Sequence, residues 1–419
     1  MRKMKKTGIL WCPEIPESWQ LGRVKDCFNI SKDISTVHNP TVLKLARSGI
    51  TVKDVSTNEG QMAESYDNYN KVKTGDLLLN PMDLYSGANC NVSEVEGVIS
   101  PAYTNLRAKI ELIPKFFDYY FKVQYWTMAM FAHGKGVSFD NRWTINAESV
   151  KSYEIPFPSL LEQKRIVDEL NQKCSEVDAL IANEEKQIEK LKEYKQSLIT
   201  EVVTKGLDPD AHMKDSGVEW IGDINANYTV NNIRSLFEIK KDIIGHEPDT
   251  VLSITQNGLK IKNINENSGQ MANSYANYQI VRKGDFAMNH MDLLTGGIGI
   301  SEYDGVTSPD YRVFQLRNSE MNPRYFLYIF ESYYRNKIFY AFGQGAANLG
   351  RWRLPAKNFY STYIPVAPID EQNSIVEYLD GKCNRVDHLI NIKQNKIVML
   401  NKYKRSLIYE YVTGKKEVN

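Results

Sequence analysis

The chain has 419 residues, a formal net charge of +1 at pH 7 and 42% hydrophobic residues. Two to four domains are expected at this length, and the near-neutral charge argues against a protein that wraps nucleic acid through bulk charge alone. No apolar run approaches the about 20 residues that span a bilayer. The basic start MRKMKK is not followed by the apolar segment of a signal peptide. We therefore expect a cytoplasmic protein without a membrane partner.

The cysteines and histidines give no sign of a metal centre. The five cysteines are scattered and lack any C-x-x-C spacing, which argues against a disulfide framework and against a zinc site. The six histidines are also scattered. We expect neither a metal nor a cofactor.

Residues 1–157 are predicted to form a globular unit of the α+β class. Turn signals and short β-branched runs lead into residues 78–110, which have the spacing of several short strands. An aromatic-rich helix is predicted from Phe116 to Met130, and a glycine-rich loop follows at residues 133–143. The regular strand–helix alternation of a doubly wound sheet is absent.

Residues 158–205 are predicted to form one long helix. The stretch has no Pro or Gly after Pro158 and is dense in good helix formers. Steps of four and three from Leu170 meet mostly apolar residues, which is typical of a coiled-coil seam. The seam residues chosen on this basis are Leu170, Val177, Ile181, Glu184, Ile188, Leu191 and Leu198.

The second half of the chain repeats the first. Trp11 matches Trp220, an offset of 220 − 11 = 209, and the motif at residues 60–63, GQMA, recurs at residues 269–272. Residues 206–367 are therefore predicted to be a linker and a second globular unit, and residues 368–419 a second long helix. Its seam repeats at Leu379, Val386, Ile390, Lys393, Ile397, Leu400 and Leu407. A period this long indicates a tandem domain duplication, and two helices of matching design are expected to pair.

Two features of the repeat resemble a known family. Each long helix is preceded by Ile-Pro and, five residues later, Glu-Gln: Ile155-Pro156 to Glu162-Gln163, and Ile364-Pro365 to Glu371-Gln372. The linker after the first helix, residues 206–224, reads GLDPDAHMKDSGVEWIGDI. Together these motifs resemble the specificity subunit of type I restriction–modification enzymes, and the resemblance covers nearly the whole chain.

The resemblance implies two target-recognition domains separated by two long helices that pair as an antiparallel coiled coil. It implies that each domain recognises one half of a bipartite target in double-stranded DNA. The partners implied are two adenine methyltransferase (modification) subunits, which dock on the helices, and restriction/translocase subunits. The chain itself would be the non-catalytic specificity subunit.

The glycine-rich loops are the candidate DNA-binding elements. They combine backbone freedom with cations and an aromatic residue, a mixture suited to contacts with phosphates and base edges. The candidates are Lys135, Asn141, Arg142 and Trp143 in the first loop and Gln344, Asn348, Arg351 and Trp352 in the second. The alternative is that the Arg-Trp pairs, which are the same in both loops, anchor each loop on its domain core.

Enzymatic signatures are incomplete. Residues 80–83, Asn-Pro-Met-Asp, are similar to the Asn-Pro-Pro-aromatic motif of amino-methyltransferases, but they lack the second proline and the aromatic residue. The glycine pairs of the loops follow an aromatic helix rather than a strand, which is the wrong context for a methyl-donor site. We expect no catalytic residue. The alternatives are a standalone DNA methyltransferase or nuclease, and a coiled-coil adaptor with no nucleic-acid role.

Overall fold

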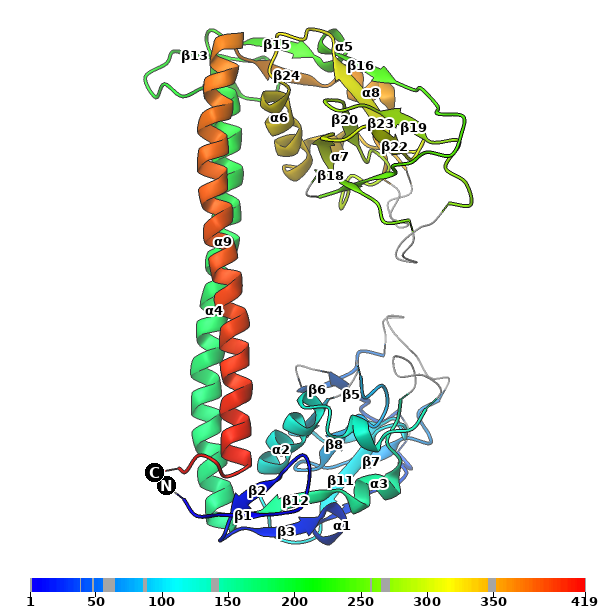
Figure 1. Cartoon of the computed structure of the whole chain (residues 1–419), viewed down its shortest axis with the longest axis vertical. Coiled ribbons are helices and arrows are strands. Elements are labelled where there is room, and N and C mark those ends of the chain that lie inside the picture. The colour runs from blue at the N-terminus through cyan, green and yellow to red at the C-terminus, as the bar shows by residue number, and fades with distance from the viewer. Residues whose placement is uncertain are drawn as a thin grey trace. The chain divides into compact units, whose positions relative to one another are not determined.

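A computed structural model describes most of the chain as two compact units (Figure 1). We call residues 1–184 with 395–419 the first unit, and residues 185–394 the second unit. The described residues are 2–37, 39–46, 49–55, 65–85, 89–136, 143–256, 258–264, 272–345 and 352–418.

The first unit is built on a four-stranded antiparallel sheet. The strands lie in the order β4 (Phe28–Ile30), β11 (Thr104–Ala108), β8 (Leu77–Leu79) and β9 (Cys90–Val92). Side chains alternate between the two faces of a strand. Accordingly Leu77 and Leu79 belong to the main hydrophobic core, whereas Leu78 belongs to a smaller core on the other face. Both faces are covered, which explains why β8 has three consecutive leucines.

The smaller core includes residues of two antiparallel strand pairs, β5 (Leu43–Ala46) with β6 (Gly49–Val52), and β7 (Asn70–Val72) with β10 (Gly97–Ile99). The remaining elements of this unit surround the main core. They are β1 (Met4–Lys6), β2 (Glu14–Pro16), β3 (Gln20–Arg23), α1 (Val24–Cys27), the 3-10 turn η1 (Phe131–His133), α3 (Ala147–Ser152) and β12 (Glu154–Phe157).

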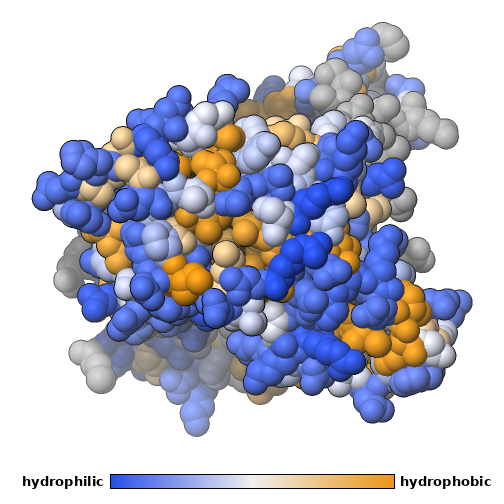
Figure 2. All heavy atoms as spheres, turned by 90° about the horizontal axis from the view of Figure 1, so that it is seen from above, coloured by the Kyte–Doolittle hydropathy of each residue, from blue (hydrophilic) through white to orange (hydrophobic). Residues whose placement is uncertain are grey.

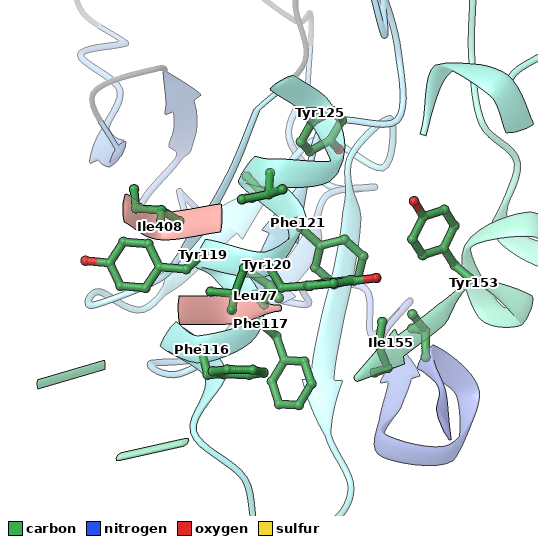
Figure 3. Close-up of a cluster of buried hydrophobic side chains, with 14 of the residues drawn as sticks. Leu77, Phe116, Phe117, Tyr119, Tyr120, Phe121, Tyr125, Tyr153, Ile155 and Ile408 are labelled. Atoms are coloured by element: carbon green, nitrogen blue, oxygen red, sulfur yellow. The ribbon is translucent and has the colours of Figure 1, made fainter. Parts of the chain in front are cut away.

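Helix α2 (Pro114–Trp126) supplies most of the main core. Proline suits the first turn of a helix, where its missing N–H has no intrahelical partner. Phe116, Phe117, Tyr120 and Phe121 are fully buried, and Figure 3 shows them gathered with residues of β8, β12 and the C-terminal helix. The helix predicted from Phe116 to Met130 ends earlier, at Trp126, because Met128 takes a left-handed φ of 61° that an α-helix cannot include.

The second unit repeats this plan. Its sheet order is β16 (Phe237–Lys240), β23 (Arg312–Leu316), β20 (Phe286–Met288) and β21 (Ile298–Ile300), and α6 (Pro323–Arg335) takes the place of α2. The remaining elements are β13 (Met213–Asp215), β14 (Asp223–Asn225), β15 (Thr229–Asn232), α5 (Ile233–Leu236), β17 (Leu252–Thr255), β18 (Gly258–Ile261), β19 (Gln279–Val281), β22 (Gly305–Thr307), α7 (Ile338–Ala341), α8 (Ala356–Ser361) and β24 (Tyr363–Val366). The predicted α+β class and the tandem duplication are confirmed.

The long helices are α4 (Leu160–Lys205) and α9 (Ile369–Val412), which lie side by side within each unit (Figure 1). In the first unit, Asp178 of α4 pairs with Lys404 of α9 at 2.6 Å, and Glu169 accepts a hydrogen bond from Tyr411 at 3.3 Å. Because α9 numbers fall as α4 numbers rise, the helices are antiparallel. The predicted antiparallel pairing is confirmed.

The predicted seam residues are all buried or half-buried. Leu170, Val177, Glu184, Ile188, Leu198, Leu379, Val386, Ile390 and Leu407 are buried, and Ile181, Leu191, Lys393, Ile397 and Leu400 are half-buried. Two seam positions are polar. Glu184 is 4% exposed and pairs with Lys396 at 2.6 Å, while Lys393 donates a hydrogen bond to Gln187. A buried charge left without a partner would strongly destabilise the helix pair.

The face of the molecule in Figure 2 is mostly hydrophilic, with apolar side chains in separate patches. Within the described part of the chain, no helix is both long and apolar enough to cross a membrane.

Candidate nucleic-acid interface

In each unit the glycine-rich loop closes on a pair of main-chain hydrogen bonds, which we call the loop base. Lys135 and Thr144 exchange N–H···O bonds of 2.8 and 3.0 Å in the first unit. Gln344 and Arg353 exchange bonds of 2.9 and 3.1 Å in the second. The two loops therefore leave their domains from the same backbone framework but begin with different side chains.

A tryptophan holds each loop base in place through a hydrogen bond and ring packing, an arrangement that we call the tryptophan lock. The indole N–H of Trp143 donates to the carbonyl of Phe131 at 2.9 Å, and its ring stacks on the Phe131 ring with centroids 5.4 Å apart. A Cβ atom at Gly134 would lie 2.4 Å from the Trp143 Nε1. Only glycine leaves room for the indole at this position.

The second unit has the same lock. Trp352 donates to the carbonyl of Tyr340 at 2.8 Å, and a Cβ atom at Gly343 would lie 2.4 Å from its Nε1. Both tryptophans are half-buried. These contacts support the alternative in which the tryptophans anchor the loops.

The structure brings a second segment, distant in sequence, against each loop base. We call residues 80–85 and 289–294 the Asn-Met-Asp turns. In the first unit, Leu84 N–H donates to the Trp143 carbonyl at 3.0 Å, and Ile145 N–H donates to the Pro81 carbonyl at 2.9 Å. The Tyr125 hydroxyl of α2 also donates to the Asn80 carbonyl at 2.8 Å. Turn and loop base thus form one hydrogen-bonded unit.

The second unit repeats these bonds. Leu293 N–H donates to the Trp352 carbonyl at 3.2 Å, and Leu354 N–H donates to the His290 carbonyl at 2.8 Å. The Tyr334 hydroxyl donates to the Asn289 carbonyl. The motif considered as an incomplete methyltransferase signature therefore supports the glycine-rich loop by main-chain bonds.

Each Asn-Met-Asp turn ends in an exposed apolar side chain that the sequence reasoning missed. Tyr85 is 62% exposed and Leu294 is 56% exposed. They occupy equivalent positions (294 − 85 = 209) beside a motif that is otherwise shared. The sequence does contain a signal for them: Tyr85 and Leu294 differ between the two halves of the chain, whereas the Met-Asp-Leu residues directly before them are the same.

The predicted DNA-binding residues fall into three groups. Lys135 and Gln344 are exposed at the loop bases, and Trp143 and Trp352 are half-buried against them. The other four, Asn141, Arg142, Asn348 and Arg351, lie outside the described residues. Contact with DNA stays a prediction for all eight.

The described side chains do not gather into a metal site: no group of three or more His, Cys, Asp or Glu residues among them is placed to hold an ion. The five cysteines are free thiols in buried positions. Burial raises the pKa of Cys12 and of Cys27 to about 11, so these thiols are protonated at neutral pH.

The fold defines a class of protein in which two related but non-identical globular units are joined by two long antiparallel helices, and each unit contains one loop base. Residues 16–193 match the family described as "Type I restriction modification DNA specificity domain". The type I restriction enzyme MjaVIII specificity subunit of Methanocaldococcus jannaschii is 22% identical over 96% of this chain and 93% of its own length. The chain is therefore similar to specificity subunits of type I restriction enzymes.

Two further comparisons give a similar result. The type I restriction enzyme MjaX specificity subunit of the same organism is 27% identical over 66% of this chain, and the match spans 62% of that relative's length. A solved structure, described as the structural basis of complex assembly and conformational transition of the type I R-M system, is similar over 95% of this chain and 98% of its own. Its TM-score is 0.65 at 14% identity, a likeness of fold.

Proposed function

We propose that this chain is the DNA-recognition subunit of a type I restriction–modification complex, in which each unit recognises one half of a bipartite target. One observation carries the proposal: the same loop base occurs twice, with different exposed side chains. Lys135 and Tyr85 of the first unit correspond to Gln344 and Leu294 of the second. A shared framework with divergent exposed residues is what two half-sites of different sequence require.

The chemistry of these side chains supports contact with DNA. A lysine can donate to a guanine edge or to a phosphate, and a glutamine can bond bidentately to adenine. Aromatic and aliphatic side chains can contact base faces or the thymine methyl group. Loop positions held rigidly at their base lose little conformational entropy on binding.

The long helices are proposed to set the distance between the half-sites. A helix of 46 residues, such as α4, is about 69 Å long at about 1.5 Å per residue. DNA rises about 3.4 Å per base pair. The helices could therefore span on the order of 20 base pairs, which leaves room for two short half-sites about one helical turn apart.

Two exposed patches on the helices support a pair of identical partners. Leu180 and Tyr403 are 48% and 55% exposed in the first unit, and Leu389 and Tyr194 are 46% and 50% exposed in the second. The patches are related by the repeat, since 389 − 180 and 403 − 194 are both 209. Such duplicated patches suit two copies of one protein. We assign them to two adenine methyltransferase subunits, and restriction/translocase subunits would join that complex in the cytoplasm.

The proposal is tested by mapping adenine methylation in a host genome with and without the gene. We expect a gapped motif, methylated on both strands, that disappears on deletion. The chain purified alone should transfer no methyl group and cut no DNA, because the partners supply the chemistry. Methyl transfer by the isolated chain at the rate of the complex would favour a standalone methyltransferase. An unchanged methylation map, with no DNA binding by the complex, would favour an adaptor role.

A further inference from the structure

The second unit contains a buried arginine that lacks an acidic partner. Arg312, at the start of β23, is 4% exposed. One guanidinium nitrogen, Nη2, donates to the Leu354 carbonyl at 2.8 Å, and the group lies over the Phe359 ring at 4.7 Å from its centroid. The other terminal nitrogen, Nη1, is buried without a hydrogen-bond partner, and no carboxylate of the described residues forms an ion pair with this side chain. A buried charge without an acidic partner destabilises the folded state, so a bound anion would offset this cost.

A second buried nitrogen without a partner lies in the same place. The Nδ1 of His290, on the Asn-Met-Asp turn, has no hydrogen-bond partner among the described residues. Leu354 connects the two side chains, because its N–H donates to the His290 carbonyl at 2.8 Å and its own carbonyl accepts from Arg312. Both residues therefore lie at the loop base, joined by the main chain of Leu354.

The charges around His290 are positive. Burial lowers the pKa of His290, and with the smaller effect of the cations Arg312, Arg353 and Lys241 it falls to about 3. Arg353 and Lys241 are exposed, so the site has a buried part and a cationic edge at the surface. Such a concentration of donors and positive charge favours an anion.

The first unit lacks this site. At the positions equivalent to Arg312, His290 and Arg353 it has Thr104, Pro81 and Thr144 (312 − 104 = 208, where the repeat offset has slipped by one; 290 − 81 and 353 − 144 = 209). The strand pairing is equivalent in the two units, with Met288 opposite Arg312 and Leu79 opposite Thr104. The first unit therefore adopts the same fold without an arginine or a histidine at these positions. We infer that the two residues have a role in the second unit only.

We propose that Arg312 and His290 form an anion site that binds a phosphate of the DNA backbone next to the second half-site. The proposal rests on the proposed DNA-recognition function. Nη1 of Arg312 would donate a charge-assisted hydrogen bond to a phosphate oxygen, and His290 Nδ1 would donate a second in the tautomer that carries its proton there. The second half-site would then be held by a backbone contact that the first half-site lacks.

The salt dependence of DNA binding tests this assignment. The full chain in complex with its methyltransferase partner is compared with Arg312→Gln, which removes the positive charge. Loss of one phosphate contact should reduce the slope of log affinity against log salt by about 0.9. It should also weaken binding equally for targets that differ in the second half-site.

The matched control is Arg317→Gln, which removes an exposed cation of the same unit that pairs with Glu238 at 3.8 Å. This variant should keep the wild-type slope. Arg312→Lys retains the charge and should keep most of the slope, so it tests the site even if the glutamine variant folds poorly by circular dichroism. A glutamine variant that keeps the slope but discriminates less between second half-site bases would show a base contact and overturn the proposal.

A titration with inorganic phosphate tests whether the site binds a phosphate of DNA or a free phosphate ion. Imidazole ¹⁵N resonances of His290 should shift when target DNA is added to the complex and move little with millimolar inorganic phosphate. Saturation by phosphate without DNA would identify a free-anion site instead. If the wild-type complex binds no target at all, the proposed function fails; if it binds and Arg312→Gln leaves slope and affinity unchanged, only this inference fails.

Discussion

His290 makes the stability of the second unit depend on pH. Its pKa is about 3 in the folded chain and 6.5 ordinarily. Because the folded-state pKa is lowered, His290 contributes its full stabilisation above pH 6.5, and this is lost as pH falls toward 3.

We expect the free energy of unfolding in urea to fall by about 1–2 kcal/mol more in wild type than in His290→Gln between pH 7 and pH 5. His246→Gln is the control, because His246 is an exposed histidine of the same unit. Parallel pH profiles of wild type and His290→Gln would contradict the low pKa. Phosphate buffers are avoided, since an anion at this site would raise the pKa.

Gly343 is required by the tryptophan lock. A Cβ atom there would lie 2.4 Å from Nε1 and 2.6 Å from Cδ1 of Trp352, so the indole must leave the Tyr340 carbonyl. We expect Gly343→Ala to destabilise the second unit by about 1–3 kcal/mol, measured by urea unfolding with tryptophan fluorescence.

Gly381→Ala is the control, because a Cβ atom at Gly381 has no atom within 4 Å and the residue lies inside helix α9. It should raise stability by about 0.5–1 kcal/mol, since alanine is the better helix former. If the two alanine variants were equally stable, the close packing of Trp352 on Gly343 would not be needed for the stability of the second unit.

At the scale of the elements, the stability of the helix pair comes from its buried seam residues rather than from its exposed apolar residues. Leu379 is fully buried in α9, whereas Leu389 of the same helix is 46% exposed. Leu379→Ala should lower the free energy of unfolding by about 2–4 kcal/mol, and Leu389→Ala by less than about 0.5 kcal/mol.

The same two variants separate folding from partner docking. Leu389→Ala should reduce co-purification of the proposed methyltransferase partner, while its melting temperature stays close to wild type. If Leu389→Ala melts as low as Leu379→Ala, the exposed leucine is part of the fold and its assignment to a docking patch is wrong.

At the scale of the whole molecule, gap length and half-site sequence should vary independently. Insertion of about one helical turn near Lys205, at the end of α4, adds about 5–6 Å and should widen the preferred gap by roughly a base pair or two. Exchange of residues 216–366 for those of a relative should change one half-site only. Methylation mapping of both variants measures the outcome. An insertion variant with its original gap and altered half-site bases would mean that the helices do not set the spacing.

The sequence by itself determined the duplication, the α+β class of each unit and the long paired helices. These features leave periodic signals: the offset of 209 recurs along the chain, and steps of four and three from Leu170 and Leu379 place apolar residues on one helix face. It also located the glycine-rich loops, because glycine, a cation and tryptophan recur together there. The division into domains at residues 157, 205 and 367 stays a prediction.

Only the tertiary structure decided what surrounds the loops. The packing of Pro81 and His290 against the loop bases, the exposure of Tyr85 and Leu294, and the joining of Arg312 to His290 through Leu354 depend on contacts between distant segments. Sheet register and turn geometry fix such contacts, and no local propensity or period records them. The early end of α2 has the same origin, because the residues up to Met130 are compatible with a helix but Met128 turns left-handed as the chain enters the loop.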